Sequence, residues 1–413
     1  MTDRERARML DEADPLADYP ARFEPAPGVV AYFDGNSLGR PVAGLAEELV
    51  RFVRHDWGTR LIRSWDEQWM GWPEETGDLV AAAALGAAPG QTVVADSTTV
   101  LLYKLLRGMV AAQQQEDPAR VELVLDTDNF PTDRDVAEGV AAERGLRLRW
   151  IEADPAAGVT LDQVRAVVGE RTAVVLLSHV AYRSGWLADG PGVTAAAHEA
   201  GAMVLWDLCH SAGSVPLALD EWGADAAVGC TYKYLNGGPG APAFGYLARR
   251  HQDRVRQPVQ GWMGRRDPFT MGPGHEPAAG IRALLSGTPP VVGMVPVRAG
   301  VRMLAQAGIG AVRAKSLALT DLARAVVAGW PEEWGVQVAS PAEPARRGGH
   351  VTLTHPSFAD LTAELWRRGV VPDFRAPDGM RIGPAPLSTT FTELYDGLMV
   401  LHDLLAERDG ARR

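Results

Sequence analysis

Two residues that could do chemistry together, Asp207 and Lys233, each follow an apolar run of the sequence. Asp207 ends the run 202–207, and Lys233 follows the run 226–232. A carboxylate can keep a pyridine nitrogen protonated, and a lysine amine can form a Schiff base with an aldehyde, which are the two groups that pyridoxal 5'-phosphate requires. Either residue alone is commonplace, since buried strands often end in Asp and loops often carry Lys. The glycine-rich and proline-rich segments after both, and Tyr232 directly before Lys233, favour the cofactor interpretation.

The composition is that of a globular protein and excludes several other classes. The chain has 413 residues, of which 46% are apolar and 23% charged, with a formal net charge of −11. This charge, with no basic tract to offset it, argues against nucleic-acid binding. No apolar stretch approaches the ~20 residues that span a membrane, and the N-terminus lacks the apolar core of a signal peptide. The two cysteines, Cys209 and Cys230, have no CxxC spacing, so we expect a cytoplasmic protein without a metal site.

Seven short β-rich runs alternate with helical patterns between about residues 90 and 250. Continuous apolar strands separated by helices predict an α/β fold with a mostly parallel central sheet covered on both faces. Ligands of such sheets bind at the carboxyl ends of the strands, where Asp207, Lys233, Ser178 and the turn 96–99 are all expected. The runs are 92–95, 121–125, 148–152, 173–178, 202–207, 226–231 and 244–247.

The rest of the chain predicts an N-terminal arm and a second, smaller domain. Residues 349–354 alternate as a half-exposed strand does, and a helix over about 357–368 stops at Gly369. We therefore expect an N-terminal arm over 1–45 that joins the small domain, a large cofactor-binding domain over 46–295, and a small C-terminal α+β domain over 296–413.

Other residues could complete a pyridoxal phosphate site. Thr98 and Thr99 open a helix after a strand, where hydroxyls and free N–H groups can bind a phosphate, although a plain N-cap explains any single Ser or Thr equally well. Tyr232 and Thr288 are further candidate phosphate donors. Phe130 could cover one face of the pyridine, and Asp133 could reach a ring substituent, although Pro131 also suits an ordinary helix start. His210 could orient Asp207 or cover the ring.

Several longer strings resemble the kynureninase family in its bacterial form, whose members are fold-type-I pyridoxal phosphate enzymes. The likeness runs from about residue 8 to the C-terminus and is most specific around Lys233. It implies a homodimer with shared active sites and hydrolytic Cβ–Cγ cleavage of L-kynurenine or 3-hydroxykynurenine to anthranilate or 3-hydroxyanthranilate and L-alanine, in tryptophan catabolism. The strings are 33–39, 95–98, 130–133, 207–213, 228–240 and 287–290.

The resemblance assigns a role to each matching residue. Lys233, Asp207 and Tyr232 would be catalytic, and Trp262 and Thr288 would reach the phosphate of the other subunit's cofactor. Ser37 and Arg381 would bind the substrate; a bidentate pair between Arg381 and the α-carboxylate suits that role on physical grounds too. The residues expected around the cofactor are Thr98, Thr99, Phe130, Asp133, Ser178, Asp207, His210, Tyr232, Lys233, Trp262 and Thr288.

Three departures from the family pattern leave the aryl substrate open. Leu101 stands where the family usually has Asn, Met263 where an aromatic residue or another side chain is often found, and His275 where Tyr is frequent. Some of these positions could line the substrate pocket. The alternative function is therefore a kynureninase-like hydrolase that acts on a substituted kynurenine in a biosynthetic pathway.

Three more distant alternatives remain. Residues 35–39 fit the G-x-S-x-G pattern of serine hydrolases, with Ser37 as nucleophile, but they precede nearly all strands, whereas such an elbow follows several. A cysteine desulfurase or selenocysteine lyase needs a reactive cysteine in the C-terminal part, and both cysteines lie before residue 231. A non-catalytic binding protein is disfavoured by the intact Lys233, Asp207 and Arg381.

Overall fold

Alternating apolar strands and helices build a seven-stranded sheet, as the sequence predicts. The computed structural model describes residues 2–410, and the strand order is β2-β8-β7-β6-β5-β3-β4. Every pairing is parallel except those of β8, which runs antiparallel to β2 and β7. The strands are β2 (Thr92–Ala95), β3 (Glu122–Asp126), β4 (Arg147–Ile151), β5 (Thr172–Ser178), β6 (Met203–Asp207), β7 (Ala226–Gly229) and β8 (Ala243–Leu247).

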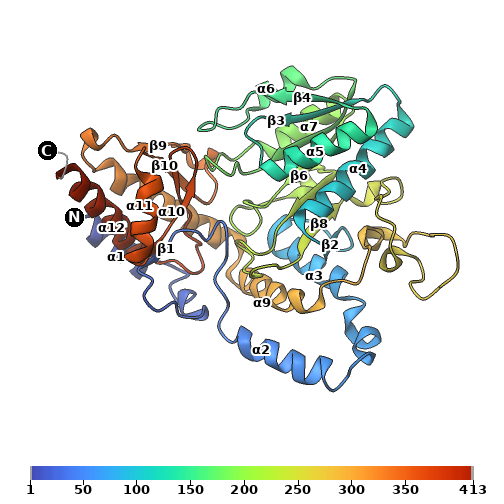
Figure 1. Ribbon diagram of the computed structural model, residues 1–413, viewed down its shortest axis with the longest axis horizontal. Coiled ribbons are helices and arrows are strands. Elements are labelled where there is room, and N and C mark those ends of the chain that lie inside the picture. Colours follow the sequence, from blue (N-terminus) through green and yellow to red (C-terminus); the bar gives the residue numbers. More distant parts are fainter. Residues whose placement is uncertain (1, 411–413) are drawn as a thin grey trace.

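Helices cover both faces of this sheet (Figure 1). Because successive side chains of a strand point to opposite faces, Val204 and Leu205 of β6 enter two different hydrophobic clusters. The Leu205 face packs against α4 and α5, and the Val204 face packs against α3, α7 and α9. Within residues 2–410, no helix is both long and apolar enough to cross a membrane. The covering helices are α3 (Trp72–Val80), α4 (Thr98–Glu116), α5 (Pro131–Arg144), α6 (Leu161–Val167), α7 (Gly190–Glu199), α8 (Leu219–Trp222) and α9 (Val291–Ala307).

The smaller body contains a four-stranded antiparallel sheet of order β12-β13-β10-β9. The N-terminal arm joins it, because α1 packs against α12 and β1 pairs with β11 (Figure 1). The domain boundaries near residues 45 and 295 stay predictions. The elements are α1 (Asp3–Glu12), β1 (Ala31–Tyr32), α10 (Ile309–Ala328), β9 (Gln337–Val338), β10 (Val351–Thr354), α11 (Phe358–Arg367), β11 (Val370–Val371), β12 (Asp373–Arg375), β13 (Gly379–Ile382) and α12 (Phe391–Gly410).

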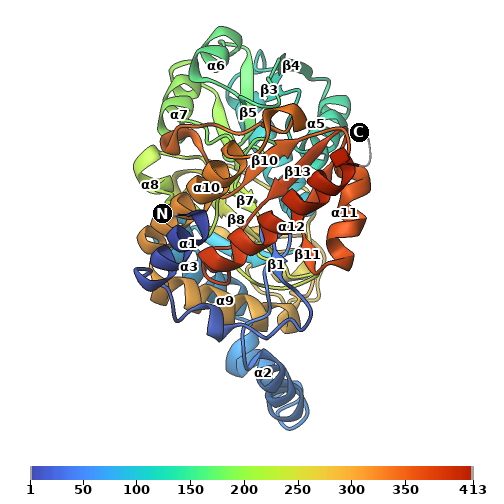
Figure 2. The same cartoon turned by 90° about the vertical axis from the view of Figure 1, so that its left-hand side faces the viewer.

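One segment projects from the body. Helix α2 (Leu45–Arg51) continues into a π-helical segment, Phe52–Trp57, and a second π-helical segment follows at Trp65–Trp69. Figures 1 and 2 show α2 standing away from both domains in two perpendicular views. Phe52 and Trp69 of this segment are buried in the hydrophobic cluster that contains Val204, whereas Val53, Trp57 and Ile62 are exposed.

Strand β7 is shorter than the predicted run 226–231, because it ends at Gly229. Beyond that point the chain turns: the Thr231 hydroxyl donates to the Pro242 carbonyl (2.6 Å), and the Gly237 N–H donates to the Thr231 carbonyl (2.8 Å). Lys233 therefore lies in a hydrogen-bonded turn after the strand rather than at its last residue.

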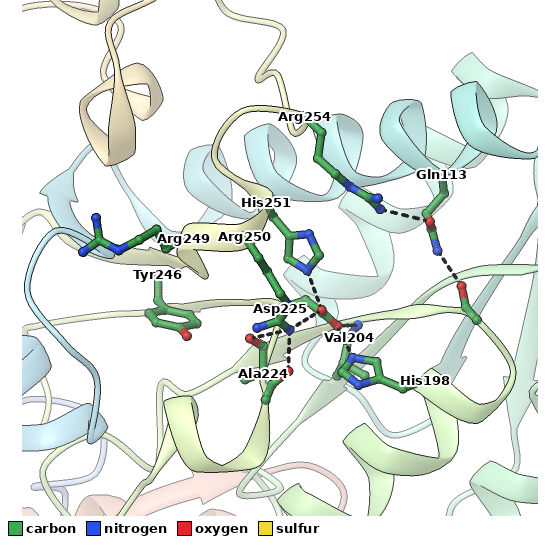
Figure 3. Close-up of polar contacts among 12 residues, drawn as sticks. Gln113, His198, Val204, Ala224, Asp225, Tyr246, Arg249, Arg250, His251 and Arg254 are labelled. Atoms are coloured by element: carbon green, nitrogen blue, oxygen red, sulfur yellow. Dashed lines mark hydrogen bonds and ion pairs between the residues drawn. The ribbon is translucent and has the colours of Figure 1, made fainter.

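The buried carboxylate of Asp225 lies near the amino ends of β6 and β7 and connects these two strands with the loop after β8 (Figure 3). Asp225 precedes β7 and accepts from the Val204 N–H of β6 (2.8 Å) and from Arg250 Nη2 (2.7 Å). The ring Nε2 atoms of His198 and His251 lie 2.8 and 2.7 Å from its two oxygens. Burial alone would raise the pKa of Asp225, but the hydrogen bonds from His198 and His251 outweigh it and hold the pKa well below the ordinary value.

Replacing Asp225 by asparagine is expected to lower the free energy of unfolding by about 2–4 kcal/mol at pH 7, because Arg250 and the other donors lose a buried, negatively charged partner. Since folding lowers the pKa of Asp225, its contribution is present above the unfolded value, near pH 4, and is lost as the pH falls further. Urea denaturation of wild type and variant at pH 7 and pH 3.5 measures this, with the exposed Asp253→Asn as control. A difference that grew at low pH would contradict the assignment.

Candidate active site

The carboxyl edge of the sheet gathers predicted functional residues from four neighbouring strands. β5 ends at Ser178 and β6 at Asp207, and these two residues are register partners. The chain that leaves β7 reaches Lys233, and the chain that leaves β3 reaches Phe130. Because β7, β6, β5 and β3 are consecutive in the sheet, the fold brings these four segments to one edge.

The chain contains only three lysines, and two of them are neutralised. Lys104 Nζ lies 2.6 Å from Asp96, and Lys315 Nζ lies 2.7 Å from Asp14; both lysine side chains are buried. Among residues 2–410, Lys233 alone of the lysines has no ion pair with a carboxylate. Its amine is therefore the one that is free to act as a nucleophile.

The surroundings of the Lys233 amine are aromatic. Its Nζ lies 3.2 Å from His210 Nε2 and 5.9 Å from the ring centroids of both Phe130 and Tyr232. The residue is only 7% exposed. A planar ligand bound to this amine would therefore pack against aromatic side chains.

Asp207 is oriented by its neighbours and lies beside a second acid. Its Oδ1 accepts from the Cys209 N–H (2.8 Å), and its Oδ2 accepts from the Ser178 hydroxyl (3.3 Å). Burial and the nearby Asp207 carboxylate raise the pKa of Asp133 well above its usual range. Within the described residues, the buried Asp133 Oδ2 has no hydrogen-bond partner. Two adjacent buried carboxyl groups with one unsatisfied oxygen fit a ligand that brings a cationic ring nitrogen and another polar substituent.

His210 connects the amine with Arg381. Its Nε2 lies 3.2 Å from Lys233 Nζ and 3.4 Å from Arg381 Nη1. Burial, followed by the charges of Lys233 and Arg381, lowers the pKa of His210 well below its usual value. The imidazole is therefore neutral at physiological pH, and Nε2 accepts from the two donors.

Arg381 reaches this edge from strand β13 of the smaller domain. It is only 1% exposed; its Nη2 donates to Ser37 Oγ (2.6 Å) and its Nη1 to the Tyr182 carbonyl (2.9 Å). Asp373 accepts from its Nε (2.6 Å). A cavity of about 290 Å³ between the two domains opens beside Arg381 and is partly lined by Arg183. A small carboxylate could approach the guanidinium from this cavity.

Ser37 is not arranged as a hydrolase nucleophile. Its hydroxyl accepts from the Arg381 guanidinium, which stays protonated and cannot act as a general base. The position instead suits the substrate-binding role that the resemblance implies.

The predicted phosphate donors lie at the start of α4 and beside Lys233. Ser97 is the N-cap of this 19-residue helix, and its side chain accepts from the Val100 N–H (3.4 Å). Thr98 and Thr99 follow in the first turn, where free N–H groups and the helix dipole favour an anion. Burial raises the pKa of Tyr232, so its phenol remains protonated at neutral pH and can donate.

Trp262 and Thr288 are placed differently from the other predicted residues. Trp262 is 40% exposed and contacts Phe269, with ring centroids 6.2 Å apart, and Thr288 is exposed. Among residues 2–410, no hydrogen bond or ring contact joins either of them to Lys233. Their predicted role toward a second subunit stays a prediction, and their exposure is compatible with it.

The departures from the family pattern lie mostly in the core. Leu101 is fully buried against Gly245 of β8, and Met263 is 1% exposed within the same hydrophobic cluster. His275 is half-buried, with its Nε2 3.3 Å from the Gly261 carbonyl. Leu101 and Met263 thus pack the α4 side of the sheet.

Sequence reasoning did not assign Cys209, Cys230, Tyr182 or Asp373 to this edge. The Cys230 N–H donates to Cys209 Sγ (3.3 Å), so the two thiols meet between the ends of β6 and β7. Their spacing offered a signal, since one cysteine follows Asp207 by two residues and the other precedes Lys233 by three. Tyr182 and Asp373 gave no comparable signal.

The residues present fit pyridoxal phosphate. Lys233 would hold its aldehyde carbon, Asp207 its ring nitrogen, and Phe130 and His210 would lie beside the ring. The phosphate would take donors from Thr98, Thr99 and Tyr232. The unpaired amine and the unsatisfied oxygen of Asp133 are the structural observations that call for such a ligand.

Several solved structures share this architecture. A cysteine desulfurase from Thermococcus onnurineus matches with a TM-score of 0.77 and 19% identity, over 91% of this chain and 95% of that chain. The cysteine desulfurase CsdA from Escherichia coli matches with a TM-score of 0.78 and 17% identity, over 95% and 98%. C-DES, solved with glycine covalently linked to its pyridoxal phosphate cofactor, matches with a TM-score of 0.78 and 17% identity, over 91% and 95%. At these identities the likeness concerns the fold alone, and that fold is the fold-type-I architecture.

Relatives of much higher identity define the family. Kynureninase from Pseudomonas fluorescens is 41% identical over 416 residues, covering 100% of this chain and 98% of that protein. Kynureninase from Burkholderia pseudomallei is 41% identical over 408 residues, covering 98% and 96%. The family model of the kynureninase C-terminal domain matches residues 312–401. The chain belongs to the kynureninase family.

Proposed function

We propose that this enzyme hydrolyses the Cβ–Cγ bond of L-kynurenine, or of its 3-hydroxy form, to release anthranilate or 3-hydroxyanthranilate and L-alanine. The observation that carries the proposal is the placement of the unpaired Lys233 amine and the buried Arg381 guanidinium on one imidazole, at 3.2 and 3.4 Å. The amine that can hold the cofactor and the cation that can hold an α-carboxylate are therefore close enough for a single bound amino acid to contact both. The full-length kinship to kynureninases supplies the substrate class.

Each residue of the site has its own role in the proposed reaction. When bound, pyridoxal phosphate supplies an electron sink conjugated to the substrate's amino group. Asp207 keeps a proton on the ring nitrogen, and Lys233, once released, takes the proton from the substrate Cα. Arg381 holds the α-carboxylate, with Ser37 beside its Nη2. Tyr232, protonated at neutral pH, donates and accepts protons in the later steps.

A product assay tests the proposal. We expect L-kynurenine, incubated with the cofactor-saturated enzyme, to give anthranilate and L-alanine in equal amounts. Parallel assays with 3-hydroxykynurenine and ring-substituted kynurenines separate tryptophan catabolism from a biosynthetic role by the highest kcat/KM. Cofactor binding without cleavage of any of these substrates would overturn the proposal.

We propose that the enzyme is a homodimer and that the projecting segment contacts the second copy. Its exposed apolar side chains include Val53 (47% exposed), Trp57 (54%) and Ile62 (76%), and large exposed apolar groups in one segment mark association sites. An apolar groove of about 300 Å³ runs from Trp57 to Pro289, which directly follows Thr288. Thr288, which is predicted to reach the other subunit's cofactor, is therefore next in sequence to the groove, and this supports the proposal. The two free thiols support a cytoplasmic, reducing location.

Replacing Ile62 by aspartate is expected to convert the dimer largely to monomer, since it puts a charge into a contact that excludes water. Light scattering with size-exclusion chromatography measures the mass. Activity should fall with dimer content, because Trp262 and Thr288 are proposed to serve the other subunit's site. Met9→Asp, which changes a residue of similar exposure (58%) on α1, should remain dimeric. A monomeric wild type, or a fully dimeric Ile62 variant, would contradict the proposal.

A further inference from the structure

The hairpin that carries Arg381 also fixes the carboxylate that faces it. Strands β12 and β13 pair antiparallel, and their register sets Asp373 directly opposite Arg381. Directly opposed residues of opposite charge in such a pair are close enough to interact. The arginine and its carboxylate are thus supplied by one short segment of the chain, eight residues apart.

One oxygen of Asp373 accepts hydrogen bonds from both arginines of the hairpin, Arg375 and Arg381. Its Oδ2 accepts from Arg381 Nε at 2.6 Å and lies 2.5 Å from Arg381 Nη2. The same oxygen accepts from Arg375 Nε at 2.8 Å. Asp373 therefore occupies the Nε edge of the Arg381 guanidinium.

The other end of the guanidinium points toward the proposed substrate site. Nη2 contacts Ser37 and Nη1 contacts the Tyr182 carbonyl and His210, the residue that also contacts Lys233. A planar guanidinium binds a carboxylate best through two parallel N–H groups. Because Asp373 holds the Nε edge of the guanidinium, it determines whether the Nη1–Nη2 end faces the ligand.

Burial makes a partner for this group necessary. Arg381 is 1% exposed, and burial lowers its pKa, while Asp373 acts in the opposite direction. A guanidinium buried without a charged partner would be strongly disfavoured and would move toward solvent. Ser37 and a backbone carbonyl provide no charge, and the second nearby carboxylate, Asp34, lies farther off, with its Oδ1 3.9 Å from Arg381 Nη2.

We propose that Asp373 is a positioning residue that aims the Nη1–Nη2 end of Arg381 at the substrate's α-carboxylate. This inference rests on the proposed role of Arg381 in substrate binding. It differs from a purely structural ion pair because it predicts an effect confined to ligands that carry an α-carboxylate.

The test compares Asp373→Ala with the wild-type holoenzyme. The KM for L-kynurenine should rise about 10- to 100-fold, since small misplacements of a positioning group have effects of this size, while kcat changes less than about threefold. The Kd for L-alanine, measured by calorimetry, should rise by a similar factor. The inhibition constant of a kynurenine analogue without the α-carboxylate should stay within about twofold.

Matched variants separate positioning from folding. Asp360→Ala removes the carboxylate of an exposed Asp–Arg pair in the same domain, 3.0 Å from Arg408, and should leave KM unchanged. Asp373→Asn keeps an acceptor for Arg381 Nε and should have a smaller effect than alanine. If Asp373→Ala fails to fold, the asparagine variant carries the test with the same ligands.

Two results would overturn the inference. One is an equal loss of affinity for ligands with and without the α-carboxylate; the other is a fall in kcat with KM and the L-alanine Kd unchanged. If L-kynurenine is not cleaved but the L-alanine Kd depends on Asp373 as described, the proposed function fails and the positioning role of Asp373 stands.

Discussion

Replacing Lys233 by alanine is expected to lower turnover of L-kynurenine by at least about 10⁴-fold, because the variant loses the covalent attachment of the cofactor and the base for the Cα proton together. No other lysine can take over, since Lys104 and Lys315 are buried in ion pairs. Steady-state assays at saturating pyridoxal phosphate measure the loss, and the visible absorbance of the lysine-linked cofactor should vanish with it.

Lys315→Met provides the matched control. Lys315 is paired with Asp14 beneath the N-terminal arm, so its loss should reduce stability without removing the lysine-linked absorbance. Turnover that survived in the Lys233→Ala variant would show that another group performs its role. A loss of the absorbance band in Lys315→Met would contradict the assignment equally.

Replacing Asp207 by asparagine is expected to reduce kcat about 10²- to 10³-fold, in the range seen when one preorganised electrostatic group is removed from an active site. The amide keeps the shape of the carboxylate and can still accept from the Cys209 N–H, but it can no longer stabilise a protonated ring nitrogen. Single-turnover and steady-state kinetics of the cofactor-saturated variant measure the effect.

Ser178→Ala separates the charge of Asp207 from its orientation. Ser178 contributes one hydroxyl hydrogen bond to Asp207 Oδ2 (3.3 Å), so its loss should reduce kcat less than about tenfold. A nearly wild-type kcat in Asp207→Asn would show that Asp207 has no catalytic role, irrespective of the result for Ser178→Ala.

The sheet could be predicted from the sequence because its signals are local. Seven apolar runs between helical patterns correspond to β2–β8, and the parallel arrangement explains why Ser178, Asp207, Phe130 and Lys233 reach one edge. The end of β7 was misjudged by two residues, because an apolar pattern continues through Cys230 and Thr231 after the ladder stops. The turn there depends on the Thr231 bond to Pro242, which no local pattern reveals.

Contacts between distant segments could not be predicted in this way. Arg381 meets Ser37 across 344 residues, and Asp225 collects His198 and His251 from two different elements. Such contacts depend on how two domains pack and on the strand register. Asp373 lies opposite Arg381 through the register of a short hairpin that the sequence pattern did not predict.

Borohydride reduction of the holoenzyme followed by peptide mapping tests the central assignment most directly. Reduction fixes the cofactor to the lysine that holds it, and the chain offers only three lysines. We expect the pyridoxyl label on the peptide that contains Lys233, with protection of that residue from labelling by excess L-alanine. Label on Lys104 or Lys315, or no label in an enzyme that cleaves L-kynurenine, would contradict the account.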